Sequence, residues 1–240
     1  MAEITEQEKL AVEELILARD ERDPALWDAV RSIESMITEA RATKGPLEDL
    51  VHSVKMRVKS EKSLRDKLYR KIDDSHKHGT AFDITIENFF EKITDLAGYR
   101  LIHLHPKQMD EINKAILHML DDRRYELIEG PEARVWDLES KAYFESINIK
   151  TKHTEEKLYS SVHYIIRTSR RASVTCELQI RTLADELWGE VDHRLNYPHK
   201  LTSIACTEQI KSLAHITTSC NRLVSSIFAS HLEWCEWEKD

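Results

Sequence analysis

Glycine is scarce in this chain, which has only five among its 240 residues. None of the five lies in the GxGxxG pattern of a dinucleotide-binding turn or in the GxxxxGK pattern of a P-loop. The sequence therefore excludes both of these phosphate-binding motifs. If the protein binds phosphates, its side chains must hold them in place of a glycine-rich loop.

Paired cysteines and long apolar runs are also lacking. The four cysteines form no CxxC pair and are expected to be reduced thiols, and the twelve histidines show no repeated spacing that would indicate a zinc site. No segment approaches the roughly 18 consecutive apolar residues of a membrane-spanning helix. The first ten residues, MAEITEQEKL, are acidic, whereas a secretory leader begins basic and then turns apolar. We therefore expect a cytoplasmic protein that does not enter a membrane.

Charge is unevenly distributed along the chain. The formal net charge of −8 argues against a general nucleic-acid coat, and residues 1–50 hold thirteen acidic residues against six basic ones. Residues 55–71 reverse the sign, since eight lysines and arginines face only Glu61 and Asp66. Such a cationic segment in an acidic protein is a candidate site for a polyphosphate, although a solvated basic helix face would have the same composition.

Apolar spacing indicates that helices and strands are mixed along the chain. Strands are predicted for 99–105, for 159–168 and 173–182 as a hairpin, and within 125–150 with a turn at Gly130-Pro131. Residues 47–56 fit a strand or a helix, and residues 76–82 are expected to form a loop. Helices are predicted for 5–21, 24–42, 61–72, 86–93, 108–121, 183–196 and 201–236, the last as one helix or two. The expected fold class is α+β, with helices around a mixed sheet.

The predicted strand at 174–181 carries polar side chains on one face. Because side chains alternate along a strand, Glu177, Gln179 and Arg181 share a face, and the residues between them are apolar. A carboxylate, an amide and a guanidinium in line suit a single ligand. An exposed strand face with a Glu–Arg surface pair would have the same pattern.

A second carboxylate precedes another predicted strand. Asp95 lies just before the strand at 99–105, where Arg100 supplies a further cation. Two carboxylates from the ends of two strands are a usual way to hold a magnesium ion that keeps most of its water and binds substrate phosphates. Basic side chains of residues 55–71 would then spread the phosphate charge.

Several short motifs together resemble the synthetase domain of RelA/SpoT-type alarmone synthetases over roughly residues 51–198. The resemblance implies a nucleotidyltransferase-like mixed sheet of about five strands, flanked by helices at 1–50 and 199–240. It also implies transfer of pyrophosphate from ATP to the ribose 3′-hydroxyl of GDP or GTP, which gives ppGpp or pppGpp and AMP. The motifs are the basic set Arg57, Lys59, Ser63 and Lys67, then DLAGYR at 95–100, YSSVHY at 159–164, ELQIRT at 177–182 and ELWGEVDHRLNYP at 186–198.

The resemblance implies a role for each matching residue. Asp95 and Glu177 would hold Mg²⁺, and Glu177 would help to deprotonate the attacking hydroxyl. Tyr159 would stack on the acceptor base, with His163 and Lys157 beside the acceptor. ATP would be bound by Arg57, Lys59, Ser63, Lys67, Arg70, Arg100, Gln179 and Arg181. Three residues are expected to be structural, on a helix behind the sheet: Trp188, His193 and Tyr197.

Two departures from the family pattern fall on the acceptor side. Lys157-Leu158 replaces the Asn-Gly that many members have before the tyrosine, and Ser160 replaces a basic residue after it. The chain also lacks the H…HD pattern of the family's hydrolase domain, so it resembles the small, synthetase-only members. Such members often associate through flanking helices, and a homo-oligomer is therefore expected.

Two other functions stay open. A toxin-like relative would use the same chemistry on tRNA 3′ ends or on adenine nucleotides. The acidic surface disfavours tRNA, whereas Lys150, Lys152 and Lys157 near the acceptor side favour it. A non-catalytic nucleotide-binding module would keep the fold without turnover, although the charged residues that catalysis requires are all present.

Overall fold

A six-stranded mixed sheet forms the centre of the computed structural model, which describes residues 4–154, 158–169, 172–196 and 203–238. The strand order is β1-β2-β6-β5-β3-β4. β2–β6 and β3–β4 pair in parallel, and the other neighbours pair antiparallel. The α+β prediction is confirmed, and the sheet has one strand more than the expected five. The strands are β1 (Ser53–Val58), β2 (Ala97–His103), β3 (Glu126–Val135), β4 (Lys150–His153), β5 (Ser161–Arg167) and β6 (Cys176–Thr182).

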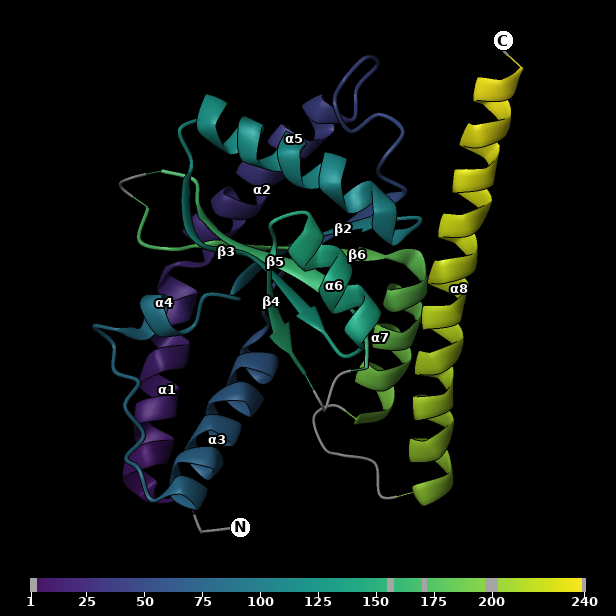
Figure 1. The fold of residues 1–240 in the computed structure, drawn as a ribbon. Helices are drawn as coiled ribbons and strands as arrows, with labels where there is room; N and C mark the ends of the chain where they lie inside the picture. Colours follow the sequence, from purple (N-terminus) through teal and green to yellow (C-terminus); the bar gives the residue numbers. More distant parts are fainter. Residues whose placement is uncertain (1–3, 155–157, 170–171, 197–202, 239–240) are drawn as a thin grey trace.

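Helices lie on both sides of the sheet (Figure 1). α2 (Asp23–Ala40) and α5 (Met109–Asp122) are on one side, and α1 (Glu6–Glu21), α3 (Glu61–His78) and α7 (Leu183–Asn196) are on the other. α8 (Ile204–Trp237) is one long helix that runs beside α7 at the edge of the molecule. The short helices are α4 (Phe89–Lys92), η1 (Pro106–Gln108) and α6 (Leu138–Ser146). Within the described ranges, no helix has the length and hydropathy needed to span a bilayer.

The two faces of the sheet differ in chemistry because side chains alternate along each strand. Tyr99, Leu178 and Tyr164 are aligned across β2, β6 and β5, and all three are buried in the main hydrophobic core. α2 packs against β1, β2 and β6, and α5 packs against β3, which covers this apolar face. The side chains of the opposite face are polar and lie on the side of α3 and α7. The sheet therefore separates an apolar layer from a polar cleft.

The β5–β6 hairpin is confirmed, but three local predictions were wrong. Part of 125–150 forms α6, because Asp137 caps a helix by accepting a hydrogen bond from the N–H of Ser140 at 2.9 Å. β3 continues through Gly130-Pro131, where we expected a turn, since Gly130 adopts a φ of 97° and the strand bulges there. α3 extends into the expected loop and ends at Gly79, whose φ is 66°.

A buried carboxylate joins α7 to the sheet and to α8. Asp185 accepts hydrogen bonds from the hydroxyl of Thr182 at 2.6 Å, the N–H of Ser160 at 3.2 Å and the amide of Asn221 at 3.0 Å. Burial raises the pKa of Asp185, and these donors act against the rise. Trp188, one turn further along α7, is buried and donates a hydrogen bond to the carbonyl oxygen of Ile210 on α8 at 3.0 Å. These contacts fix α7 and α8 to each other and to the sheet.

We expect Trp188→Ala to lower the free energy of unfolding by about 3–5 kcal/mol, because it empties a well-packed site between α7 and α8. Urea unfolding followed by circular dichroism measures the loss. Leu10→Ala is the control, since Leu10 is 65% exposed on α1, and its loss should stay within about 0.5 kcal/mol. Equal losses in the two variants would contradict the role assigned to Trp188.

Candidate active site

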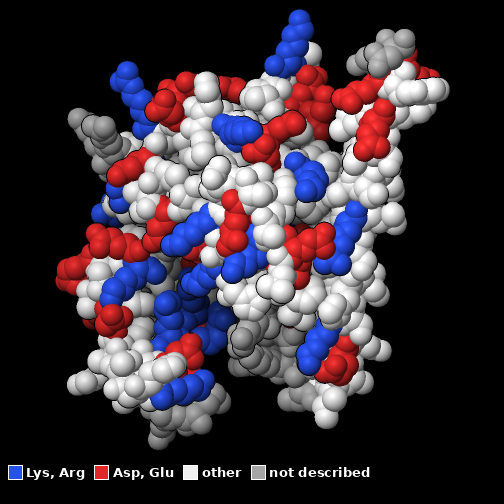
Figure 2. Space-filling model, viewed as in Figure 1, with Lys and Arg blue, Asp and Glu red and all other residues white. Residues whose placement is uncertain are grey.

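The polar face of the sheet gathers charged and amide side chains from four neighbouring strands. The register places Glu177 beside Gly98, and Gln179 between Arg100 and His163. Figure 2 shows lysine and arginine atoms lining a hollow between the part of the molecule that carries α1 and α3 and the part that carries α7 and α8. The face comprises Lys55 and Arg57 of β1, Gly98 and Arg100 of β2, Glu177, Gln179 and Arg181 of β6, and Ser161 and His163 of β5.

Asp95, just before β2, is held by two lysines. The Nζ atoms of Lys59 and Lys67 each lie 2.7 Å from a different carboxylate oxygen of Asp95. Burial alone would raise the pKa of Asp95, but the two ammonium groups hold it well below its ordinary value. Burial also lowers the pKa of Lys59. With Asp95 ionised, the two lysines leave this cluster with an excess of positive charge.

Glu177 is paired with a neutral histidine. Its Oε1 lies 2.8 Å from Nδ1 of His163, and Nε2 of the same ring lies 2.7 Å from Oγ of Ser161. Burial lowers the pKa of His163, so the ring is neutral at pH 7. Because an ionised carboxylate only accepts, Nδ1 must carry the proton and Nε2 must accept from the Ser161 hydroxyl.

The same contact keeps Glu177 ionised. Burial alone would raise the pKa of Glu177, but the hydrogen bond from His163 and the charge of Arg134 lower it below its ordinary value. The carboxylate is therefore available as a proton acceptor at neutral pH. Its orientation is set by His163, which Ser161 holds in one tautomer.

Glu186 of α7 organises the arginines of the same face. Nη1 of Arg100 lies 3.0 Å from Oε1 of Glu186, and Nε of Arg181 lies 2.8 Å from Oε2. Gln179 accepts hydrogen bonds from both arginines, at 3.0 Å and 3.2 Å. Nζ of Lys55 adds a third cation 2.7 Å from Glu186. One buried carboxylate thus orders three cations beside the cleft.

The remaining residues predicted on the donor side lie on β1 and α3. Arg57 is exposed, and its side chain lies over Gly98 in ordinary van der Waals range. Ser63 and Arg70 share one helix face with Lys67. Seven of the eight residues predicted to bind ATP therefore belong to, or lie beside, the groups of cationic side chains described above. The eighth, Arg70, lies one turn beyond Lys67 on α3 and is exposed.

The residues predicted on the acceptor side are placed differently. Tyr159 is 7% exposed, with the guanidinium of Arg181 5.2 Å from its ring centroid and the ring of Trp188 5.4 Å away. A base that stacked on Tyr159 would have to take the place of one of these neighbours. His163 contacts Glu177 directly, and Lys157 lies outside the described residues.

Sequence reasoning missed several residues of the cleft. Arg134 of β3 pairs in register with Ser161, and its charge acts on both His163 and Glu177. Trp188 is buried, as expected of a structural residue, but α7 lies on the polar side of the sheet and not behind it. After burial, the charge of Arg57 is the main cause that lowers the pKa of His193, which places this ring on the cleft side of α7. The spacing of Glu186, Glu190 and His193 is the signal that could have identified the cleft-facing side of α7. Tyr197 lies outside the described residues.

Asp95 and Glu177 are the carboxylates predicted to hold a metal ion, and each oxygen of Asp95 already contacts a lysine. They lie at the starts of the parallel neighbours β2 and β6, and the charge of Asp95 acts to raise the pKa of Glu177. No group of three or more His, Cys, Asp or Glu side chains suitable for a metal occurs in the described part of the chain. Two carboxylates without further protein ligands fit a hard divalent ion that keeps waters and binds phosphate oxygens, and they do not fit zinc.

A comparison with known families identifies the group to which the chain belongs. The model described as the region found in RelA/SpoT proteins matches residues 56–202. The chain belongs to the RelA/SpoT family. The matched region contains Asp95, Glu177 and His163, and members of this nucleotide-transferring family are expected to use a divalent metal. No curated protein sequence matches the chain.

Solved structures share the fold of this RelA/SpoT-family chain. Small alarmone synthetase 1 from Bacillus subtilis, bound to its product pppGpp, is 17% identical with a TM-score of 0.60, over 89% of this chain and 97% of that one. A GTP pyrophosphokinase family protein from Streptococcus pneumoniae is 19% identical with a TM-score of 0.61, over 89% and 94% of the two chains. The Bacillus subtilis protein bound to AMPCPP is 16% identical with a TM-score of 0.55, over 92% and 98%. At these identities the likeness establishes the shared fold.

The Asp95 cluster of this RelA/SpoT-family chain predicts a pH-dependent contribution to stability. Asp95→Asn should lower the free energy of unfolding at pH 7 by about 3 kcal/mol, because it leaves the buried Lys59 without its partner. The folded-state pKa of Asp95 is depressed, so its contribution is complete above the unfolded pKa and is lost as pH falls through the folded one. The difference between wild type and variant should therefore shrink below about pH 4.

Urea unfolding at a series of pH values from 7 downwards measures this difference. Asp74→Asn is the control, since Asp74 is 66% exposed and lies 3.6 Å from Lys77 on the surface of α3. A destabilisation by Asp95→Asn that is constant with pH would show that the ion pairs are not its cause.

Proposed function

We propose that this protein is an alarmone synthetase that transfers pyrophosphate from ATP to the ribose 3′-hydroxyl of GDP or GTP. The observation that carries the proposal is the ionised Glu177, oriented by neutral His163, next to the cationic cluster around Asp95. A fixed base beside concentrated positive charge suits attack of a hydroxyl on a polyphosphate. Membership of the RelA/SpoT family supports the same reaction class.

In the proposed reaction the 3′-oxygen of the acceptor attacks the β-phosphorus of ATP. The new O–P bond forms while the bond from the β-phosphorus to the α–β bridging oxygen breaks, and AMP leaves with that oxygen. Glu177 receives the proton of the attacking hydroxyl. Such a reaction needs little covalent chemistry from the protein, so positioning and charge supply most of the rate enhancement.

On the donor side, Lys59 and Lys67 would contact the phosphates of ATP, because they lie at the cluster with excess positive charge. The exposed guanidinium of Arg57 is available to stack on adenine. Ser63, Arg70, Arg100, Gln179 and Arg181 would complete the donor site. We assign Mg²⁺ to Asp95 and Glu177, and when bound it would neutralise charge that develops on the phosphate oxygens.

On the acceptor side, a basic strip extends the cleft toward the sheet edge. Arg134 of β3 pairs in register with Lys152 of β4, and Lys150 and Lys152 are both exposed. The strip could bind the phosphates of GDP or GTP beside His163, Tyr159 and Lys157. The same strip favours the second candidate function, in which the acceptor is a tRNA 3′ end or an adenine nucleotide, because a polynucleotide backbone also presents phosphates.

The test is incubation of the purified protein with Mg²⁺ and β-labelled ATP, with GDP, GTP, ATP or bulk tRNA offered separately. We expect label to move to a guanine nucleotide, and Glu177→Gln to reduce the transfer by about 10²–10⁴-fold, because the proton acceptor is lost. Glu126→Gln is the matched control, since this residue is exposed on β3 and pairs with Arg167 away from the cleft.

The other outcomes separate the alternatives. If label moves to tRNA or ATP and not to a guanine nucleotide, the second candidate function is correct and the proposed acceptor is wrong. Absence of transfer to every acceptor, with nucleotide binding retained in both wild type and Glu177→Gln, would leave a non-catalytic nucleotide-binding module.

We also infer that two copies of the chain associate through α8. A continuous 3-4 spacing of mostly apolar residues turns away from α7, and five of them are more than half exposed: Ile216, Leu223, Ile227, Trp234 and Trp237. The same spacing on a second copy would fit it in a two-fold contact, since a heptad stripe is self-complementary. The stripe runs from Ile216 to Trp237 through Cys220, Leu223, Ile227, Ser230 and Trp234.

Sedimentation equilibrium tests this association. We expect a dimer or higher oligomer for the wild type and a monomer for the double variant Leu223→Glu, Ile227→Glu, because two charges would be buried in the contact. Ser212→Glu, at an exposed position of α8 outside the stripe, should leave the mass unchanged. A wild-type monomer at micromolar concentration would contradict the inference.

A further inference from the structure

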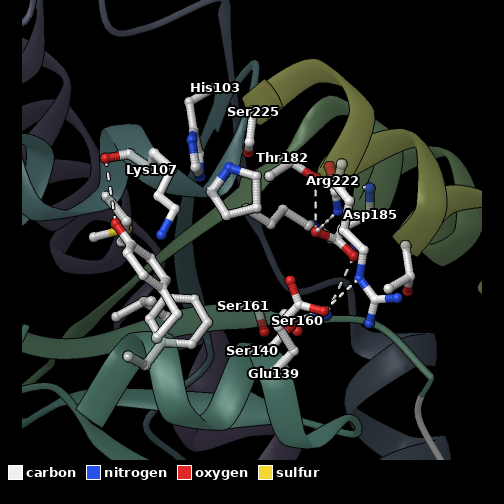
Figure 3. Close-up of a pocket in the computed structure, with 18 of the residues that line it drawn as sticks. His103, Lys107, Glu139, Ser140, Ser160, Ser161, Thr182, Asp185, Arg222 and Ser225 are labelled. Carbon is white, nitrogen blue, oxygen red and sulfur yellow. Dashed lines mark hydrogen bonds and ion pairs between the residues drawn. The ribbon is translucent and has the colours of Figure 1, made fainter. Parts of the chain in front are cut away.

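A cavity of about 340 Å³ lies beyond the ends of β2 and β6, between η1, α6 and α8 (Figure 3). Val162, Ile180 and Thr182 line it, and these residues belong to the apolar face of the sheet. The cavity is therefore at the opposite end of the strands from Asp95, and its floor belongs to the opposite face from Glu177. Ser161 and Arg181, at the strand ends, border both the cavity and the cleft.

α8 turns a stripe of small polar residues toward the cavity. An amphipathic helix usually buries apolar side chains against its own domain. Here Thr218, Ser225 and Ser226 line the space, and their hydroxyl groups make no hydrogen bond within the described part of the chain. The stripe leaves both room and hydrogen-bonding capacity between α8 and the sheet.

Asn221 lies in the same stripe and has an unpartnered buried atom. Its Nδ2 donates to Asp185 at 3.0 Å, whereas its Oδ1 is buried and has no hydrogen-bond partner. The residue is 7% exposed and lines the cavity. A buried amide oxygen is normally satisfied, so this atom would gain a partner if a small movement of the side chain opened it to an N–H or O–H group of a ligand in the cavity.

A cation stands at one end of the cavity without an acidic partner. Nζ of Lys107 lies 4.3 Å from the ring centroid of Tyr143 and forms no ion pair with the described residues. Arg222, on the opposite side of the cavity in Figure 3, is engaged by Glu139 at 2.8 Å. Lys107 is therefore the charge available to an anionic group of a ligand.

The remaining lining combines apolar side chains with the buried Asp185 and Arg181. Met109 and Phe144 contribute apolar surface, and His103 is neutral because burial lowers its pKa to about 4. Such walls suit the faces of a flat heterocycle. The volume is near the lower end of the roughly 300–1,000 Å³ typical of ligand pockets, which favours a mononucleotide over a larger dinucleotide.

We propose that this cavity binds a nucleoside monophosphate. The base would lie between the apolar walls and donate an N–H to Oδ1 of Asn221, and the phosphate would contact Lys107. The α8 hydroxyls would contact the ribose. This site goes beyond the proposed catalytic function and uses none of the lysines assigned to ATP. Ser161 lines the cavity and contacts His163, so only this one side chain would separate the ligand from His163.

Titration calorimetry of the full chain with AMP and with GMP tests the proposal. We expect at least one of them to bind, Ser225→Leu to weaken that binding tenfold or more by filling the cavity, and Ser219→Leu, the same change at an exposed position of α8, to leave it unchanged. Lys107→Ala should weaken the nucleotide tenfold and leave the matching nucleoside unaffected. None of these variants changes a residue of the catalytic cleft, so a nucleotide bound in the cleft would bind equally to all of them. The test therefore remains valid even if the proposed reaction fails.

Two results would overturn the proposal. One is equal affinity of wild type, Ser225→Leu and Lys107→Ala for both nucleotides. The other is inorganic phosphate binding as tightly as the nucleotides with the same dependence on Lys107, which would leave a simple anion site. Lys107 is exposed, so its variant keeps the test decisive if Ser225→Leu does not fold.

Discussion

A carboxylate removed from water must be compensated by charge or by hydrogen bonds, and this requirement organises the polar half of the molecule. Asp95 is compensated by two lysines and Glu186 by two arginines and a lysine. Glu177 is compensated by a neutral histidine and the charge of Arg134, and Asp185 by three neutral donors and the charge of Arg181. Removing any one of these carboxylates would leave cations or donors without partners, so the cleft is a connected network and not a set of independent side chains.

The different partners give the four carboxylates different chemistry. The ammonium groups around Asp95 hold its pKa far below the ordinary value, which suits a permanent anion. Glu177 faces an uncharged imidazole that donates one hydrogen bond, so its second oxygen stays free of any described partner. A carboxylate with one oxygen anchored and one available is suited to accept a proton.

The sequence predicted the parts of the site that depend on alternation along a strand. Glu177, Gln179 and Arg181 share a face because residues two apart on a strand must do so, and the β5–β6 hairpin follows from two β-rich runs with a short polar link. Asp95 could be assigned because it directly precedes β2. In each case a rule that applies within one strand, or to two strands adjacent in the sequence, was sufficient.

The parts that were missed depend on tertiary contacts. The burial of Tyr159 comes from Trp188 and α8, which are distant in sequence. The cleft-facing side of α7 was not evident because its helix has polar residues on more than one face, and only packing against α8 decides which face turns inward. α6 is an exception, because its signals are local: Asp137 caps it, and Glu139, Lys141 and Ala142 favour a helix.

The ion pairs of Asp95 also bear on the entropy of ligand binding. Free lysine side chains sample many rotamers, and holding one in place on binding costs about 0.5–1.5 kcal/mol. Lys59 and Lys67 are already held by Asp95 in the folded protein, so part of this ordering is completed during folding. An anion that enters the cleft therefore meets charges that are preorganised, and its affinity is reduced less by side-chain immobilisation.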